Sequence, residues 1–307
     1  MKYLLLLSLF VLSFGSSIAA QATGDPVSKV IDAKQLLRDV EILSADDMEG
    51  RLVGSPGGIK ARNYLVKRFN EIGLVEIGGK TLQPFPYTGR DKVEVQGANV
   101  FGMLKGTKHP DKYIVITAHY DHLGIRNGVI YNGADDDASG TSAIMAMAAY
   151  FKKHPTENSL IFVAFDAEES GGVGSKKFVA EPPVAKESIV MDVNIDMIGQ
   201  NDKNELYASG TYHYPFLKPH LEPIAKDAKV KLILGHDRPE QGQDDWTFQS
   251  DHGSFHREKI PFIYFGVEDH KDYHKPTDDP ETITPAFFGL AVGTMLAAVR
   301  RLDRVRP

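Results

Sequence analysis

The sequence predicts an α/β fold, a single domain with a mixed, largely parallel central sheet covered by helices on both faces. From residue 112 onward, continuous apolar runs such as YIVIT at 113–117 and LIFVAF at 160–165 alternate with segments of helical spacing. Continuous apolar runs are typical of strands buried on both faces, and helices between them are typical of parallel crossover connections. The sequence contains no internal repeat and no low-complexity linker, so one domain accounts for the chain after its N-terminal segment.

Each helix is predicted from apolar residues that recur every three or four positions. Ile31, Leu36 and Val40 can share one face, for example, and Gly73 is typical of a helix C-cap. On these patterns we expect helices over 31–43, 57–73, 139–153, 174–180 and 285–305, and strands over 81–85, 93–104, 113–117, 160–165, 188–195, 230–234 and 261–267.

Composition narrows the possible functions. The 307 residues are 42% hydrophobic and 25% charged, which is ordinary for a globular protein with a large core. Lys+Arg 35 against Asp+Glu 41 gives a net charge of −6, so the chain lacks a basic excess and we expect no nucleic-acid partner. The absence of cysteine excludes disulfides and thiolate ligands, so any metal site must use His, Asp and Glu.

The first 22 residues have the pattern of a secretory signal peptide. Lys2 precedes an apolar run at 3–14, and Ala20 and Ala22 provide a small-residue cleavage site. The alternative is an uncleaved anchor, but the run is shorter than the ~20 residues needed to cross a bilayer. We expect cleavage to leave 23–307 as the mature domain, exported to the periplasm or outside the cell and with no membrane partner.

Histidines and carboxylates gather in five short segments, several of them directly after apolar strands, where an open α/β sheet presents its ligand crevice. The segments are HYDH at 119–122, ADDDASG at 134–140, DAEES at 166–170, NIDM at 194–197 and DYHKPTDD at 272–279. Singly, each has an ordinary explanation as a helix cap, a surface histidine or a solvated loop. Together they supply the nitrogen and oxygen ligands that a cation such as Zn²⁺ accepts.

The spacing within these segments adds to the argument. His119 and Asp121 are two positions apart and face the same way in extended chain, so Asp121 can orient the imidazole. Glu168 and Glu169 face opposite ways, so one can bind a metal while the other faces a water. Asp196 lies in an apolar run, and aspartate is rarely buried without a partner or a metal.

The ordered set of motifs resembles the co-catalytic di-zinc exopeptidases typified by bacterial secreted leucine aminopeptidase. The matching motifs are His-x-Asp at 119–121, GADDDASG at 133–140, AEE at 167–169, DM at 196–197 and YH at 273–274. The resemblance covers roughly residue 44 to the C-terminus. It implies a zinc exopeptidase-like fold, two zinc ions per chain and a peptide substrate with a free N-terminus.

The resemblance also implies roles for individual residues. The metal ligands would be His119, Asp136, Glu169, Asp196 and His274, and the catalytic residues Glu168 and Asp121. His119 and Asp196 would hold one zinc, and Glu169 and His274 the other. Asp136 would bridge both, because the family's bridging Asp lies three residues before the Ser of the Ser-Gly pair at 139–140, and a cis peptide often follows it. Glu168 would be the general base, and Asp121 the partner of His119.

Other functions of the same fold stay open. A carboxypeptidase would need a cation for the substrate's C-terminal carboxylate, and Arg126 and Arg257 are candidates. Glutaminyl cyclases on this fold use one zinc and lack the first metal-binding histidine, whereas His119 is present here. Binding domains that have kept the fold lose metal ligands, whereas this chain keeps all five. The residues alone do not exclude a carboxypeptidase, and the resemblance to secreted bacterial aminopeptidases is what favours an aminopeptidase.

One region departs from the family pattern. Some secreted members have a disulfide near the substrate pocket, which this chain cannot form. The corresponding segment, 244–255, contains Trp246 and Phe248, which could line an apolar pocket, and a Ser-Asp-His motif at 250–252 similar to a recurrent family motif. Tyr264 or Tyr273 could donate a hydrogen bond to the substrate's carbonyl oxygen.

Overall fold

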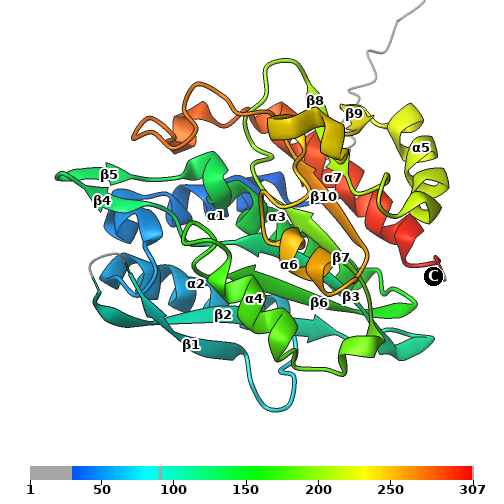
Figure 1. Cartoon of the computed structure of the whole chain (residues 1–307), viewed down its shortest axis with the longest axis horizontal. Coiled ribbons are helices and arrows are strands. Elements are labelled where there is room, and N and C mark those ends of the chain that lie inside the picture. Colours follow the sequence, from blue (N-terminus) through cyan, green and yellow to red (C-terminus); the bar gives the residue numbers. More distant parts are fainter. Residues whose placement is uncertain (1–29, 90–91, 306–307) are drawn as a thin grey trace, which may run out of the picture.

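The computed structural model describes residues 30–89 and 92–305, and within them an eight-stranded sheet in the order β1-β2-β6-β3-β7-β10-β8-β9 (Figure 1). The remaining two strands form a separate hairpin that projects from the molecule. The strands are β1 Leu82–Thr88, β2 Glu94–Leu104, β3 His109–His119, β4 Gly124–Arg126, β5 Val129–Tyr131, β6 Asn158–Phe165, β7 Ile189–Ile195, β8 Glu205–Ser209, β9 Lys231–Leu234 and β10 Phe262–Gly266.

The centre of the sheet is parallel and its sides are mixed. Strands β6, β3, β7 and β10 pair in parallel. On one side β2 and β1 are added antiparallel, and on the other β8 runs antiparallel to β10 and parallel to β9. The predicted mixed, largely parallel sheet is therefore confirmed. Because the four central strands point the same way, their carboxyl ends meet at one edge.

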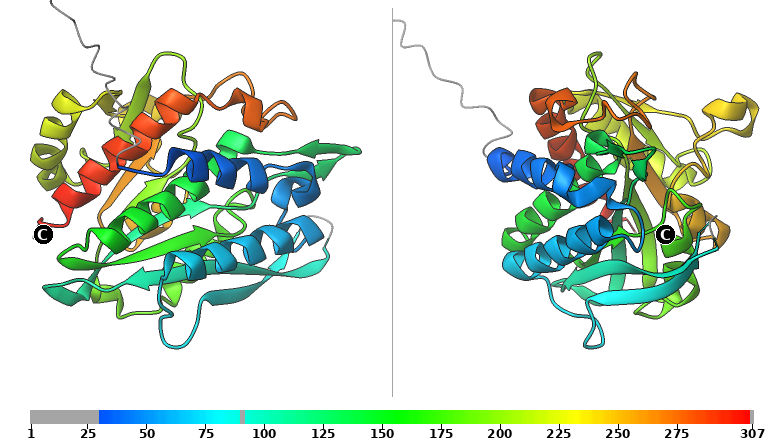
Figure 2. Two further views of the ribbon diagram at one scale, coloured as in Figure 1. Left: turned by 180° about the vertical axis from the view of Figure 1, so that it is seen from behind. Right: turned by 90° about the vertical axis from the view of Figure 1, so that its left-hand side faces the viewer.

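Helices cover both faces of this sheet, as expected. The face seen in Figure 1 carries α4 and α6, and the opposite face carries α1, α2, α3 and α7 (Figure 2), with α5 beside α7 and β9. The helices are α1 Ala33–Leu43, α2 Pro56–Ile72, α3 Gly140–Lys153, α4 Val173–Ala180, α5 Lys218–Asp227, α6 His252–Arg257 and α7 Pro285–Leu302.

Alternating side chains on the central strands divide the core into two clusters. On β3, Ile114 and Ile116 pack in the larger cluster with the helices of the second face, whereas Val115 packs in the smaller one with Phe178 of α4 and Phe255 of α6. This alternation follows from the two-residue period of a strand. It explains why the strand sequences are apolar throughout.

Several elements were not predicted from the sequence, namely β4, β5, β8, α5 and α6. Strands β4 and β5 have only three residues each, and α5 contains Pro223, which interrupts a helical pattern. The predicted signal peptide at 1–22 lies outside the described residues. Helix α7 is long and apolar enough to cross a membrane, but 61% of it is buried inside the fold, as in a core helix.

Candidate metal centre

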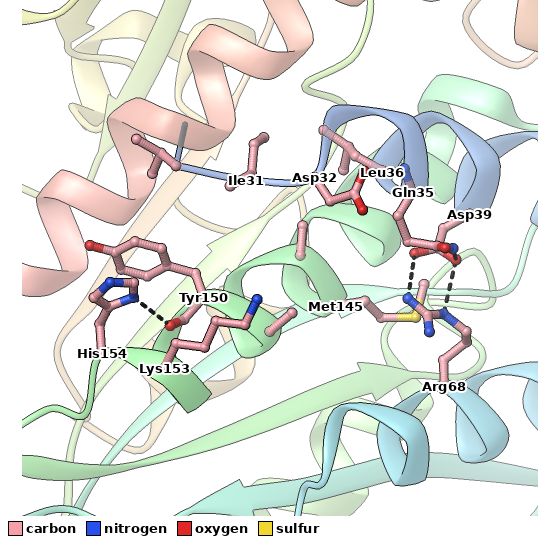
Figure 3. A pocket seen from close by; sticks show the side chains of 13 residues that line it. Ile31, Asp32, Gln35, Leu36, Asp39, Arg68, Met145, Tyr150, Lys153 and His154 are labelled. Carbon is pink, nitrogen blue, oxygen red and sulfur yellow. Dashed lines mark hydrogen bonds and ion pairs between the residues drawn. The ribbon is translucent and has the colours of Figure 1, made fainter. Parts of the chain in front are cut away.

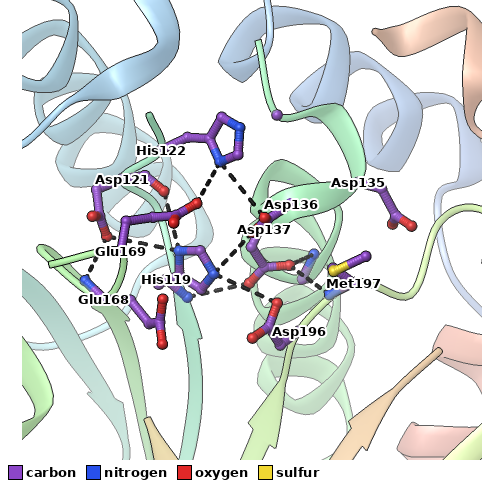
Figure 4. Close-up of polar contacts among 12 residues, drawn as sticks. His119, Asp121, His122, Asp135, Asp136, Asp137, Glu168, Glu169, Asp196 and Met197 are labelled. Atoms are coloured by element: carbon purple, nitrogen blue, oxygen red, sulfur yellow. Dashed lines mark hydrogen bonds and ion pairs between the residues drawn. The ribbon is translucent and has the colours of Figure 1, made fainter. Parts of the chain in front are cut away.

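The carboxyl ends of the parallel strands carry most of the predicted site residues. His119 is the last residue of β3, Glu168 and Glu169 follow β6, and Asp196 follows β7. Asp136 comes from the segment just before α3, and its carboxylate faces His119 (Figure 4). His274 comes from the loop between β10 and α7. The sheet thus brings together five segments that are far apart in the sequence.

Each of the five residues predicted as ligands lies within 3.5 Å of at least one of the others. His119 Nε2 is 3.3 Å from Asp136 Oδ1 and 3.5 Å from Asp196 Oδ1. His274 Nε2 is 3.1 Å from Asp136 Oδ2 and 3.2 Å from Glu169 Oε2. Asp136 therefore presents one oxygen to each histidine, which is the arrangement that a carboxylate bridging two cations requires.

His122 also lies in this cluster, although sequence analysis assigned it no role. Its Nδ1 is 2.7 Å from Glu169 Oε1 and 3.7 Å from Asp136 Oδ2, and its side chain is fully buried. His122, Asp136 and Glu169 are close enough to hold a cation together. Its sequence signal was its place in the HYDH segment, one position beyond Asp121.

The three consecutive aspartates have different partners. Asp135 accepts hydrogen bonds from the backbone amides of Gly199 and Gln200, at 2.6 and 3.2 Å. Asp137 Oδ1 accepts from the amides of Gly140 and Met197, and its Oδ2 from His119 N. Two of the three carboxylates therefore connect the backbones of neighbouring segments. Asp135 also contacts His270, at 3.0 Å, and Asp136 is the one whose carboxylate lies between His119 and His274.

The backbone of the site contains unusual conformations. The peptide between Asp136 and Asp137 is cis, as the family resemblance implied. Ala167, Met197 and His274 have φ values of 61°, 54° and 53°, in the left-handed region that non-glycine residues rarely adopt. Each of the three is a site residue or directly adjoins one. Strained backbone of this kind persists only where surrounding contacts hold it.

Asp121 is linked to both His119 and Glu168. Its Oδ1 accepts a hydrogen bond of 2.9 Å from the Glu168 backbone amide. The same oxygen is 3.7 Å from His119 Nδ1, whereas the backbone carbonyl of Asp121 is nearer to that nitrogen, at 3.1 Å. The residue therefore orients the imidazole mainly through its main chain, and its carboxylate positions the Glu168 turn.

Burial and mutual charge shift the pKa values of the groups in this cluster. Burial raises the pKa of Glu168 well above its usual range, and the charge of Asp251 adds to this. Burial alone would lower the pKa of His274, but its hydrogen bonds to Asp136 and Glu169 raise it to about 10. The pKa of His119 is likewise raised, since neighbouring carboxylates outweigh its burial.

A buried arginine holds the segment that carries Asp136. Arg51 has no exposed surface, and its guanidinium donates hydrogen bonds to the backbone carbonyls of Leu43, Tyr120, Asn132 and Gly133. On the other side, the Asp278 carboxylate accepts from the backbone amides of Asp135 and Asp136, at 2.9 and 3.1 Å. Sequence analysis assigned no role to either Arg51 or Asp278.

Two cavities meet at the cluster. One, of about 280 Å³, is lined by Glu168, Trp246, Tyr264 and Tyr273 among others. A larger one, of about 960 Å³, shares Glu169, Gly171 and His274 with the first. Trp246 therefore lines a pocket, but this pocket is mostly polar and not apolar as predicted, because the carboxylates and histidines of the cluster form much of its lining.

Phe248 lines neither cavity and is 52% exposed, with Arg257 over its ring. The Ser-Asp-His motif at 250–252 lies buried nearby, and among the described residues neither carboxylate oxygen of Asp251 has a hydrogen-bond partner.

Known proteins with similar sequences include an aminopeptidase and a probable zinc metalloprotease. "Aminopeptidase YwaD" of Bacillus subtilis is 30% identical over 219 residues, which is 66% of this chain and 44% of that protein. A "Probable zinc metalloprotease" of Pyrenophora tritici-repentis is 29% identical over 155 residues, 47% of this chain and 35% of that protein. The chain thus spans less than half the length of these two relatives.

Solved structures share the fold over nearly the whole chain. The "Aminopeptidase from Aneurinibacillus sp. strain AM-1" has a TM-score of 0.74 at 18% identity, with 92% of this chain and 96% of that chain covered. A glutaminyl cyclase of Bacteroides thetaiotaomicron, bound to N-acetylhistamine, has a TM-score of 0.68 at 19% identity, with 88% and 97% covered. Finally, the family model "Peptidase family M28" matches residues 99–299. This chain belongs to peptidase family M28.

Proposed function

We propose that this chain is a metal-dependent aminopeptidase that holds two zinc ions around Asp136. The observation that carries the proposal is the position of Asp136 between two histidines, with Oδ1 3.3 Å from His119 Nε2 and Oδ2 3.1 Å from His274 Nε2. Membership of a peptidase family supports the proposal, as do relatives named as an aminopeptidase and a probable zinc metalloprotease.

The chemistry of the donor set fits zinc, which accepts imidazole nitrogen and carboxylate oxygen. Two buried oxygens of the cluster, Glu169 Oε1 and Asp196 Oδ1, accept no hydrogen bond of good geometry from the described residues. Buried polar atoms are normally paired, so a cation would satisfy them. We assign His119 and Asp196 to one zinc, Glu169 and His274 to the other, and Asp136 to both.

When bound, the two zinc ions would lower the pKa of a water molecule and polarise the scissile carbonyl. Glu168 accepts the proton of the attacking water and delivers it to the leaving amine. Asp121 fixes the turn that carries Glu168 by accepting a hydrogen bond from its backbone amide. Tyr264 and Tyr273 both line the cavity, and either hydroxyl can donate to the developing oxyanion.

A specific observation favours this function over that of a single-zinc cyclase. His119 and Asp196 form a complete donor pair on the side of Asp136 opposite to His274. An enzyme that uses one metal has no need of this second pair. We therefore expect two metal ions per chain, measured by elemental analysis of the purified protein.

The test of the proposal is Glu168→Gln, which keeps the shape of the side chain but removes its basicity. We expect this variant to retain two metal ions per chain and to hydrolyse leucyl-p-nitroanilide about 10²–10⁴-fold more slowly, the usual contribution of a general base. Glu181→Gln is the matched control, because Glu181 is 69% exposed and pairs with Lys177. An unchanged kcat in Glu168→Gln would exclude Glu168 as the base, and chelator-resistant hydrolysis would exclude the metal mechanism.

A second pair of variants tests the ligand assignment, because both His122 and His274 contact Glu169. We expect His274→Asn to lose one of the two metal ions and His122→Asn to retain both with weaker binding. Metal content after dialysis against a graded series of chelator concentrations distinguishes them. The reverse order would make His122 the ligand.

We also propose that residues 1–22 are a cleaved export signal and that the mature protein begins at Thr23. The support is the sequence pattern of Lys2, the apolar run and the alanine pair. Intact-mass measurement of protein from the culture medium and the periplasm tests this. Full-length mass in a membrane fraction would contradict it.

A further inference from the structure

The larger of the two cavities extends away from the proposed zinc ligands toward the β4–β5 hairpin. Its described lining includes Glu169 and His274 of the cluster together with Leu52, Tyr87 and, from the hairpin, Arg126. Its volume of about 960 Å³ is more than three times the 280 Å³ of the cavity that contains Glu168 and Trp246. An aminopeptidase needs space for one residue before the scissile bond and for several after it. The larger cavity fits the second requirement.

The hairpin is anchored to the metal centre at both of its ends. Strand β4 begins two residues after His122, and β5 ends five residues before Asp136. Residues Asn127 and Gly128 form its turn, both with positive φ, as in a two-residue hairpin. A four-residue step spans at most about 14 Å, so Arg126 cannot lie farther than this, Cα to Cα, from His122.

Arg126 has the properties of an anion-binding group. It is exposed, it is the only Lys or Arg among the described residues that line either cavity, and the described residues give it no carboxylate partner. Register places Arg126 and Tyr131 on the same face of the hairpin, and the guanidinium carbon lies 5.5 Å from the centre of the Tyr131 ring. This stacking supports the side chain while leaving its hydrogen-bond donors available.

We propose that Arg126 binds the C-terminal carboxylate of short peptide substrates, and that it makes the enzyme prefer peptides of three or four residues with a free C-terminus. The inference rests on the proposed aminopeptidase function. The first residue lies in the smaller cavity and the next two or three extend through the larger one. Each extended residue covers about 3.3–3.6 Å, so the carboxylate of such a peptide falls within the reach set by the hairpin. Guanidinium and carboxylate form paired hydrogen bonds that an amide cannot reproduce.

The test is a series of peptides with an N-terminal leucine followed by one to four glycines, each as the free acid and as the C-terminal amide. For the wild-type metal-loaded protein we expect kcat/KM of the acid to exceed that of the amide by about tenfold at three or four residues, mainly through KM. Arg126→Gln should reduce this ratio to below about twofold, and Arg126→Lys should leave it intermediate. Arg257→Gln, which changes an arginine that lines neither cavity, should keep the wild-type ratio.

Two outcomes would overturn the inference: an acid-to-amide ratio near one at every length in the wild type, or a ratio that Arg126→Gln leaves intact. Failure of the proposed function is recognised separately, with N-acetylated versions of the same peptides. An aminopeptidase does not cleave these, whatever the role of Arg126. If the N-acetylated peptides are cleaved and the C-terminal amides are not, the enzyme is a carboxypeptidase and the proposed function is wrong. Arg126 would then still be the group that binds the terminal carboxylate.

Discussion

Two arginines that contact α1 are stabilised in opposite ways. Arg51 is fully buried and donates to backbone carbonyls, with no carboxylate among its hydrogen-bond partners. Arg68 lies beside a small cavity of about 90 Å³ between α1 and α3, where its guanidinium faces the Asp39 carboxylate (Figure 3). Its Nε is 3.0 Å from Asp39 Oδ1, its NH1 group is 2.8 Å from Glu71 Oε2, and its side chain remains 15% exposed.

The difference shows how each charge is balanced. Arg68 has two carboxylates in direct contact, and Lys67 Nζ lies 3.7 Å from the second of them, Glu71, so the four charges cancel locally. Arg51 is balanced only at a distance, because burial lowers its pKa while the charges of Asp136, Asp278 and Asp121 raise it. The acidic cluster and its buried arginine therefore support one another. Loss of Arg51 should affect the metal centre, whereas loss of Arg68 should not.

The largest expected effect is that of Arg51→Met. It removes a buried charge and leaves several buried carbonyls unpaired, so we expect the free energy of unfolding to fall by about 3–5 kcal/mol. Urea denaturation of the metal-free protein measures this. Arg51→Lys is the second variant, because it keeps the charge but has too few donors for four carbonyls, and it should lose about half as much stability. A change within about 1 kcal/mol of wild type in both variants would contradict the comparison.

A smaller effect on the free energy of unfolding is expected for His252, a buried residue that, unlike arginine, can be neutral. Burial lowers the pKa of His252 to about 3, and its Nε2 lies 2.8 Å from the Trp246 carbonyl. In the unfolded chain the pKa is near 6.5, so below that pH the unfolded state binds a proton that the folded state does not. Stability is then lost as the pH falls from about 6.5 toward 3, by about 2 kcal/mol at pH 5.

The variant His252→Gln should lack this pH-dependent loss of stability. The difference in free energy of unfolding between pH 7 and pH 5 should thus be smaller in the variant than in the wild type, measured by urea denaturation at each pH. Equal pH dependence in the two proteins would show that His252 is not kept neutral.

The smallest effect is expected for Arg68→Met. Asp39 is 1% exposed but keeps the hydrogen bonds from Gln35 and Tyr64, so it is not left unpaired. We expect a loss of about 1 kcal/mol in the free energy of unfolding, typical of a partly exposed ion pair, with the metal content unchanged from wild type. In 1 M NaCl the loss of stability in Arg68→Met should shrink, because salt screens exposed ion pairs. The loss of stability in Arg51→Met should persist, because Arg51 is buried. Loss of metal from Arg68→Met would break the distinction between the two arginines.

The sequence predicted the parts of this molecule that depend on local pattern. The buried strands and amphipathic helices were found within a few residues of their observed bounds because apolar spacing reports directly on burial. The sequence did not indicate Arg51, because a buried arginine is rare and its partner Gly133 lies 82 residues away in the chain. The residues alone also could not distinguish Asp136 from its neighbours. That choice came from the family resemblance, and its structural reason is that backbone amides occupy Asp135 and Asp137.

The exposed face of the β4–β5 hairpin offers a practical route to observing substrate binding. Val129 is 46% exposed and pairs across the hairpin with Arg126. Because the 307 residues include no cysteine, Val129→Cys would supply a single thiol for a fluorescent label. The dye would then sit beside Arg126, the proposed carboxylate-binding residue, and its emission could follow peptide binding and release in real time without any other site being labelled.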